Sequence, residues 1–391
     1  MQRELPVPRL AKSKYRLGWI LAIPALAVLT FLTIQGIGGL VKRGTDGDMP
    51  EHPPIRSFDR LPPEARDTVD RAFEAYLEDE PSTIGRTLQR WTVLAADAPW
   101  QDNARLQSEV GEILSKQGFQ RRFPGSPSLF FASPSGWRVR MRSTRPGRNL
   151  WQGEEQVDQL LATCAGIGVP VQQSVETTRG TVSIGQLLES SRIECVRDQE
   201  LAWSTVAYCS YLPHQPTWKN RFGEQISYDQ VAFDLLARTP GKGPCNGIHT
   251  LIAITHILLA DDQFTIIAPD TRRHIEARMR DASLLLMQSQ LACGAWPTYW
   301  AKSSSSDSLA SQEADRSPTD LLSVTAHHLE WMIKAPQNLR PDEEAIDNAV
   351  RFLLESIKGQ DLEDIRKNQC GLSHALRVLL VLTRDNEGKL P

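Results

Sequence analysis

The sequence lacks the features that mark several common classes of protein. Its 44 lysines and arginines nearly balance its 47 aspartates and glutamates, and the formal net charge is −3. This balance argues against the strongly basic surface that nucleic-acid-binding proteins use. The six cysteines are far apart and form no Cys-x-x-Cys pair, the usual spacing of a structural zinc site. We therefore expect no nucleic-acid partner, and the strongest cysteine signal for zinc is missing.

The motifs of widespread catalytic classes are also absent. No Gly-x-Ser-x-Gly elbow of a serine hydrolase occurs, and the segment from His327 to Glu330 does not match the His-Glu-x-x-His helix of zinc proteases. The wide cysteine spacing permits disulfides in an exported domain. Most cysteines, however, lie in apolar helical patterns, which are typical of buried free thiols.

Long hydrophobic runs are rare, and a single one is long enough to cross a membrane. Residues 17–41 contain no charged residue, and about 20 apolar residues suffice for a transmembrane helix. The tail 1–16 is richer in lysine and arginine than the segment after the run, which predicts a cytoplasmic N-terminus. A cleaved signal peptide is the alternative, but no small-residue cleavage site follows. We expect a single-pass signal-anchor in the cell membrane, with the main domain outside the cytoplasm.

The remaining chain divides into three parts by composition. Residues 42–62 are polar and contain several prolines, as is typical of a linker. Residues 63–150 are expected to form a small helical module with a β-hairpin, because 129–132 and 137–141 alternate apolar and polar residues around a turn. From 151 to 391 one helical pattern follows another, with proline or glycine at the joints, which predicts a second, larger helical domain.

The helices of the larger domain alternate in character along the chain. Helices that are apolar on most sides are followed by amphipathic ones, which predicts inner helices covered by outer helices. The five predicted helices that show this are 245–259, 271–290, 320–333, 342–357 and 372–382. A closed ring of helical hairpins gives this alternation, and a stacked solenoid of helix pairs would also give it. We expect an all-α fold and favour the ring, an α/α toroid.

Three of the apolar helices carry a histidine near their start. Cys245 and Cys370 each precede a histidine by four positions, at His249 and His374, so each pair lies on one helical face. The third helix keeps His327 and has a serine in place of the cysteine. In a closed ring, the three histidines would converge at one end of a central cavity. They are the candidate acid/base groups or ligands.

Each of these histidines also has a structural interpretation, since an imidazole near a helix start can simply bond a backbone carbonyl. The cysteine and histidine pairs would suit zinc by residue type. Their spacing is not specific, so no cofactor is expected and zinc is the alternative. The candidate ligand-binding residues are Cys245, Cys370, His328 and three aromatic residues expected at the rim of the cavity, Trp296, Tyr299 and Trp300.

One further motif resembles a known superfamily. The segment from Gln290 to Trp296 fits Gln-x-x-x-Gly-x-Trp. It is similar to the repeated glutamine–tryptophan motif of the squalene and terpenoid cyclases, whose toroid is shared by the protein prenyltransferases. The resemblance implies that this motif joins an outer helix to the next inner helix and ties neighbouring turns of the toroid together. The acidic Asp-x-Asp-Asp motif of the hopene-type cyclases is absent, and so is the Asp-x-Cys segment of the zinc-dependent prenyltransferases. The resemblance therefore implies a fold without an activity.

Three functions are compatible with these features. We favour a toroid that binds a ligand, lipid-like or glycan, in its central cavity. The first alternative is a non-catalytic scaffold that presents its outer face to another envelope protein. The second alternative is a metal- or histidine-dependent enzyme of the toroid superfamily.

Overall fold

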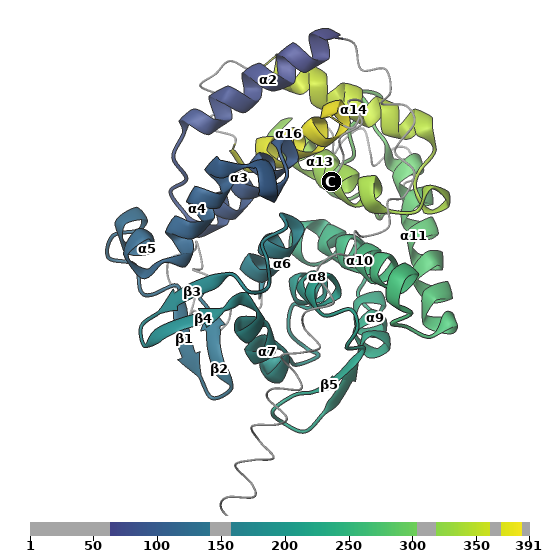
Figure 1. Ribbon diagram of the computed structural model, residues 1–391. Coiled ribbons are helices and arrows are strands. Elements are labelled where there is room, and N and C mark those ends of the chain that lie inside the picture. The colour runs from purple at the N-terminus through teal and green to yellow at the C-terminus, as the bar shows by residue number, and fades with distance from the viewer. Residues whose placement is uncertain (1–62, 141–157, 303–317, 360–368, 385–391) are drawn as a thin grey trace, which may run out of the picture. The chain divides into compact units, whose positions relative to one another are not determined.

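The computed structural model describes residues 63–140, 158–302, 318–359 and 369–384 (Figure 1). The predicted basic tail, membrane anchor and linker lie outside these residues, as does the predicted boundary at 150/151. All described residues belong to one compact unit that begins at Met49.

Helices dominate the described residues, which confirms the all-α class. They are α2 (Pro63–Glu78), α3 (Ile84–Asp97), η3 (Trp100–Asp102), α4 (Ala104–Leu114), α5 (Lys116–Arg122), α6 (Gln159–Gly166), α7 (Ile184–Glu194), α8 (Ala202–Tyr211), α9 (Tyr228–Leu236), η4 (Pro244–Gly247), α10 (Ile248–Phe264), α11 (Pro269–Ser289), α13 (Pro318–Lys334), η5 (Gln337–Leu339), α14 (Glu343–Lys358) and α16 (Gln369–Arg384). The domain is therefore built by packing helices against one another, as the repeating apolar patterns predict.

Three short antiparallel hairpins interrupt the helices. The predicted hairpin is confirmed as β1 (Phe130–Ser133) paired with β2 (Gly136–Val139). The other two, which the sequence analysis did not predict, are β3 (Ser174–Thr177) with β4 (Gly180–Ser183) and β5 (Thr217–Lys219) with β6 (Gln225–Ser227). Each of these two leads directly into a helix, α7 or α9, whose first turn is closed by a serine–glutamine capping box. The hairpins thus set where these two helices begin.

The prediction of a single-pass transmembrane protein is corrected by the structure. Within the described ranges, no helix combines the length and the apolar character needed to cross a bilayer. The segment 17–41, from which that prediction came, lies outside those ranges. The predicted cellular location stays a prediction without support from the described helices.

Burial divides the later helices as their sequence patterns predict. Every residue of α10 from Ile248 to Ala260 is buried, because neighbours surround the helix on all sides. Helix α10 contacts α8 and α13, and α13 in turn contacts α16 (Figure 1). Helix α16 also contacts α3, although the two are far apart in sequence. By contrast, α11 and α14 bury one face each, and that face contains Ile275 and Met279 in α11 and Ile346 and Leu353 in α14.

The loop after α11 ties three helices together. The side-chain amide nitrogen of Gln290 donates to the carbonyl oxygens of Gly294, at 2.9 Å, and of Ala345 in α14, at 2.7 Å. The indole nitrogen of Trp296 donates to the carbonyl of Leu286 in α11, and its backbone N–H donates to the Thr325 hydroxyl in α13. These are the ties that the resemblance implies for the motif, and the superfamily itself stays a prediction.

Gly294 permits this loop by its conformation. Its φ of 91° lies in the left-handed region, and a Cβ there would lie 2.2 Å from the carbonyl oxygen of Asn348. A side chain at this position would therefore push α14 away from the end of α11.

We predict that Gln290→Ala lowers the free energy of unfolding by about 1–3 kcal/mol, because two carbonyl acceptors lose their donor. Urea unfolding followed by circular dichroism measures this change. The matched control is Gln288→Ala on the exposed face of α11, which should change the free energy by no more than about 0.5 kcal/mol. Equal effects of the two substitutions would contradict the role assigned to Gln290.

Candidate functional site: a thiol and histidine cluster

A cavity of about 140 Å³ lies among the buried helices. It is lined chiefly by α10, α13 and α16, and also by residues of α3, α6 and α8. The groups able to bind metals or transfer protons at its first layer are Cys245, His249, His327, Glu330, Cys370 and His374. The predicted convergence of the three histidines in one cavity is thus confirmed.

A strained turn places Cys245 at the start of α10. Cys245, Asn246 and Gly247 have φ angles of 47°, 57° and 78°, so three successive residues occupy the left-handed region. A non-glycine residue there costs on the order of 1–3 kcal/mol, and such strain is concentrated at functional sites. The indole nitrogen of Trp300 donates to the carbonyl of Asn246 at 3.0 Å and helps hold the turn. The result is a cysteine just before a buried helix, with its thiol lining the cavity.

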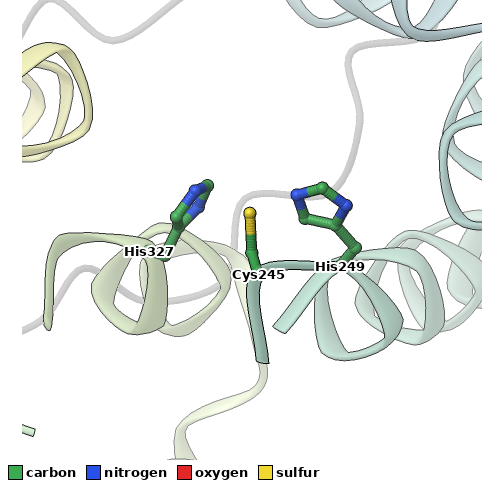
Figure 2. A group of neighbouring side chains, drawn as sticks. All are labelled: Cys245, His249 and His327. Carbon is green, nitrogen blue, oxygen red and sulfur yellow. The ribbon is translucent and has the colours of Figure 1, made fainter. Parts of the chain in front are cut away.

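Cys245 of η4 lies between two imidazole rings, those of His249 from the first turn of α10 and His327 from α13 (Figure 2). The sulfur and one nitrogen of each ring all lie within 4.8 Å of one another. Burial raises the pKa of the Cys245 thiol, but the charge of His327 and hydrogen bonds from both histidines outweigh this effect and lower it to about 4. The thiol is therefore a thiolate at neutral pH, and the helix N-terminus stabilises the same charge.

Glu330 organises the cluster from the side opposite the thiol. The Nδ1–H groups of His327 and His374 donate to its two carboxylate oxygens, at 2.9 and 3.0 Å. Arg377 also donates to this carboxylate, at 3.1 Å. Burial raises the pKa of Glu330, but the charges of His374 and Arg377 and the bond from His327 hold it well below its usual value. Because Nδ1 of His327 is taken by Glu330, its Nε2 is the nitrogen available to Cys245.

The same contacts make His327 a cation. Burial lowers the pKa of its imidazole, yet the Cys245 thiolate and the Glu330 carboxylate raise it well above its usual value. The ring of His374 lies against it, with ring centroids 3.6 Å apart. The pKa of His374 is also raised, because Glu330 and Cys370 outweigh burial and the charge of His327. Two neighbouring imidazoles therefore share one carboxylate, whose charge favours the protonated form of each ring.

Cys370 forms a second thiol–imidazole pair. A hydrogen bond with His374 is the main cause that lowers the pKa of its thiol to about 7. Gln89 of α3 donates its side-chain amide to the sulfur at 3.3 Å. Both Cys-x-x-x-His pairs predicted from the sequence are thus formed, and Glu330 connects them.

Four of the predicted ligand-binding residues are not among the residues that line this cavity: His328, Trp296, Tyr299 and Trp300. His328 is fully buried, and its ring packs against Trp296 and Trp300 with centroids 5.7 and 4.8 Å apart. It accepts a hydrogen bond from the indole of Trp331, and burial holds its pKa well below the usual value, so it is neutral. Tyr299, which precedes Trp300 in the sequence, is also buried. These side chains pack α13 and the loop after α11 rather than contact a ligand in the cavity.

The structure adds site residues that sequence reasoning missed. Glu330 is three positions after His327, and Arg377 is three positions after His374, so each shares a helical face with its histidine. The sequence shows this spacing. It does not show the contact between α13 and α16, which brings His327, Glu330, His374 and Arg377 together. Trp203 of α8, 4.6 Å from the His249 ring, was not predicted either.

The donor set of Cys245, His249 and His327 fits a zinc ion. Zinc prefers thiolate and imidazole ligands, and catalytic zinc sites use three protein ligands with an open fourth position. The Nδ1 atom of His249 is buried and has no hydrogen-bond partner among the described residues. A carboxylate behind a ligand histidine, as Glu330 lies behind His327, is the usual outer partner in zinc sites. His327, Glu330 and His374 are a second close group, but Glu330 already binds both rings and Arg377.

We predict that Cys245 reacts with iodoacetamide at a rate that changes less than about threefold between pH 5 and pH 8, since its thiolate is already formed above its lowered pKa. An ordinary cysteine slows roughly tenfold per pH unit below its pKa of about 8.5. Peptide mass spectrometry in the presence of a metal chelator measures the rate at each cysteine, with exposed Cys293 as the internal reference. A tenfold fall per unit at Cys245 would contradict the ion pair.

We predict that Glu330→Gln raises the pKa of Cys245 by at least about one unit, because an amide cannot stabilise the imidazolium of His327. The same alkylation profile measures this shift. Glu355→Gln, an exposed change on α14, should leave the profile unchanged. An unaltered profile in Glu330→Gln would show that Glu330 does not control the thiol.

Neither a protein-family model, nor a curated protein, nor a solved structure matches this chain. The chemistry of the cluster is therefore inferred from its own geometry.

Proposed function

We propose that the described helices form an α/α toroid. Contacts between helices support this, because they can be followed from α3 through α6, α8, α10, α13 and α16 and back to α3. A stacked solenoid would leave its first and last helices apart, whereas α16 packs against α3. The amphipathic α11 and α14 suit the outer layer. Helix α3 then belongs to the ring, although the sequence analysis assigned it to the small helical module.

The ties made by Gln290 and Trp296 support a relation to the terpenoid cyclase and prenyltransferase-like toroids. The catalytic motifs of those enzymes are missing from the sequence. A shared fold does not carry an activity with it, so the function proposed here comes from the cluster alone.

The proposed function is that of a zinc-dependent enzyme acting on a small ligand in the cavity. Cys245, His249 and His327 would hold the ion. When bound at such a site, zinc supplies a Lewis acid that polarises an oxygen atom of a ligand. Glu330 holds protons on the Nδ1 atoms of His327 and His374 and so fixes both rings. His374 can exchange a proton with a ligand beside it.

The observation that carries this proposal is the meeting of one thiolate and two imidazoles from separate helices at one point of an open cavity. A scaffold would have no need of a polar cavity, and packing would ordinarily fill it with apolar side chains. The cavity volume of about 140 Å³ suits a small ligand rather than a whole lipid or glycan chain.

A second candidate is favoured by the lowered pKa of the Cys245 thiol. The cluster contains a nucleophile, Cys245, a neighbouring base, His327, and a carboxylate that orients the base, Glu330. In that case Cys245 would attack an electrophilic carbon, and His327 would return a proton to the leaving group. Both candidates use the same sulfur atom, so metal content separates them.

We predict about one zinc ion per chain in the purified protein, measured by inductively coupled plasma mass spectrometry. Cys245→Ser and His327→Ala should each bind zinc at least about tenfold more weakly, because each removes a ligand. The controls are Cys293→Ser and His274→Ala, which change an exposed cysteine and an exposed histidine outside the cavity. Circular dichroism confirms that each variant is folded.

Zinc at one equivalent in the controls and its loss from the two ligand variants would support the proposal. A metal-free protein that stays metal-free after incubation with zinc would overturn it. Rapid alkylation of Cys245 in that protein, unaffected by chelators, would then favour the cysteine nucleophile.

A further inference from the structure

A second polar layer lies deeper in the same cavity. Helices α10, α13 and α16 each supply a residue of the thiol and histidine cluster, and each also supplies a nitrogen-bearing side chain two turns further on. The pairs, each separated by seven positions, are His249 and His256 of α10, His327 and Lys334 of α13, and Cys370 and Arg377 of α16. Seven residues of helix rise about 10 Å along the axis, and Arg377 links the two layers by its bond to Glu330.

The members of this deeper layer lie close together. The Nζ atom of Lys334 is 3.4 Å from the Nε2 atom of His256. Arg377 is near enough to both for its charge to lower their pKa values. All three residues line the cavity. The deeper layer is therefore one site rather than three separate side chains.

This layer has too little negative charge of its own. No carboxylate of a described residue lies within ion-pair distance of Lys334, and Glu330 is the one acid that faces the layer, through its bond with Arg377. Glu330 is also the acceptor for the imidazoles of His327 and His374. His256 is 5% exposed, and its Nδ1 atom has no partner among the described residues. A half-buried amine without a counter-ion is costly, and an anion would remove that cost.

We propose that His256, Lys334 and Arg377 form an anion-binding subsite, so that the ligand of the cavity carries a carboxylate or phosphate group at the end away from Cys245. Ile252 lies on α10 between the two layers and lines the cavity with Val206 of α8. Thr255 of α10 and Thr163 of α6 line the same cavity, so the ligand is a small organic acid or its phosphate counterpart. This inference deepens the proposed function and rests on it for the reacting end of the ligand only.

Isothermal titration calorimetry with butyrate and, separately, with inorganic phosphate tests the subsite and distinguishes the two anions. At least one should bind the full-length protein, and Lys334→Gln should weaken that binding at least about tenfold, since a charge-assisted hydrogen bond is lost. Lys334→Met is a second variant that removes the buried amine without creating a new polar group. Lys358→Gln, an exposed change on α14, is the matched control and should bind as the unmodified protein does.

The pH dependence of butyrate binding gives an independent readout. Burial, followed by the charge of Arg377, lowers the pKa of Lys334 to about 8, and Glu330 opposes this. Burial holds the pKa of His256 well below its usual value, so His256 is already neutral. Butyrate binding should therefore be strongest below about pH 8 and weaken above it as Lys334 loses its proton.

The outcomes separate this inference from the zinc proposal. Cys245→Ala should lose zinc and keep anion binding. If neither anion binds at up to about 100 mM, or if Lys334→Gln and Lys334→Met bind as the unmodified protein does, the subsite is overturned whatever the zinc content. If anion binding depends on Lys334 in a protein that takes up no zinc, the subsite stands and the zinc proposal falls.

Discussion

The site depends on one buried carboxylate. Glu330 is the acceptor for two imidazoles and a guanidinium, which come from two helices that are adjacent in space and not in sequence. Without it, the Arg377 guanidinium and the protonated His327 would face each other across the His374 ring in a poorly solvated cavity, with no carboxylate between them. With it, His327 keeps its proton and stabilises the Cys245 thiolate on its other side. Glu330 therefore holds the charged groups between Arg377 and the Cys245 sulfur in place.

The fold supplies the positions that this arrangement needs. Helix α10 is buried along most of its length, so its N-terminus has a fixed place beside α13. The left-handed turn before α10 points the Cys245 thiol toward α13, and the indole of Trp300 holds this turn by a hydrogen bond to Asn246. Burial of His328 between two tryptophans fixes α13 in turn. Aromatic packing thus serves the site indirectly, by limiting the movement of the helices that carry the ligands.

The sequence predicts some of these features and not others, for physical reasons. The Cys-x-x-x-His spacing predicts which side chains share a helical face, and the apolar surroundings of His249 predict burial. The partner of His327 could not be assigned, because Glu330 matches no known motif and Arg377 reaches it only through tertiary packing. Trp296, Tyr299 and Trp300 follow a helix end, which suggested a rim, but their large apolar surface favours burial. The hairpins β3–β4 and β5–β6 were missed because strands this short show almost no alternation.

The most direct test of the central claim is a crystal structure with anomalous diffraction recorded on both sides of the zinc edge. The proposed site requires a zinc peak about 2.0–2.3 Å from the sulfur of Cys245 and from one nitrogen each of His249 and His327. It also requires the Glu330 carboxylate to accept the Nδ1 proton of His327. Crystals grown with zinc that show no peak there, or that place the ion between Glu330 and His374 instead, would contradict the account.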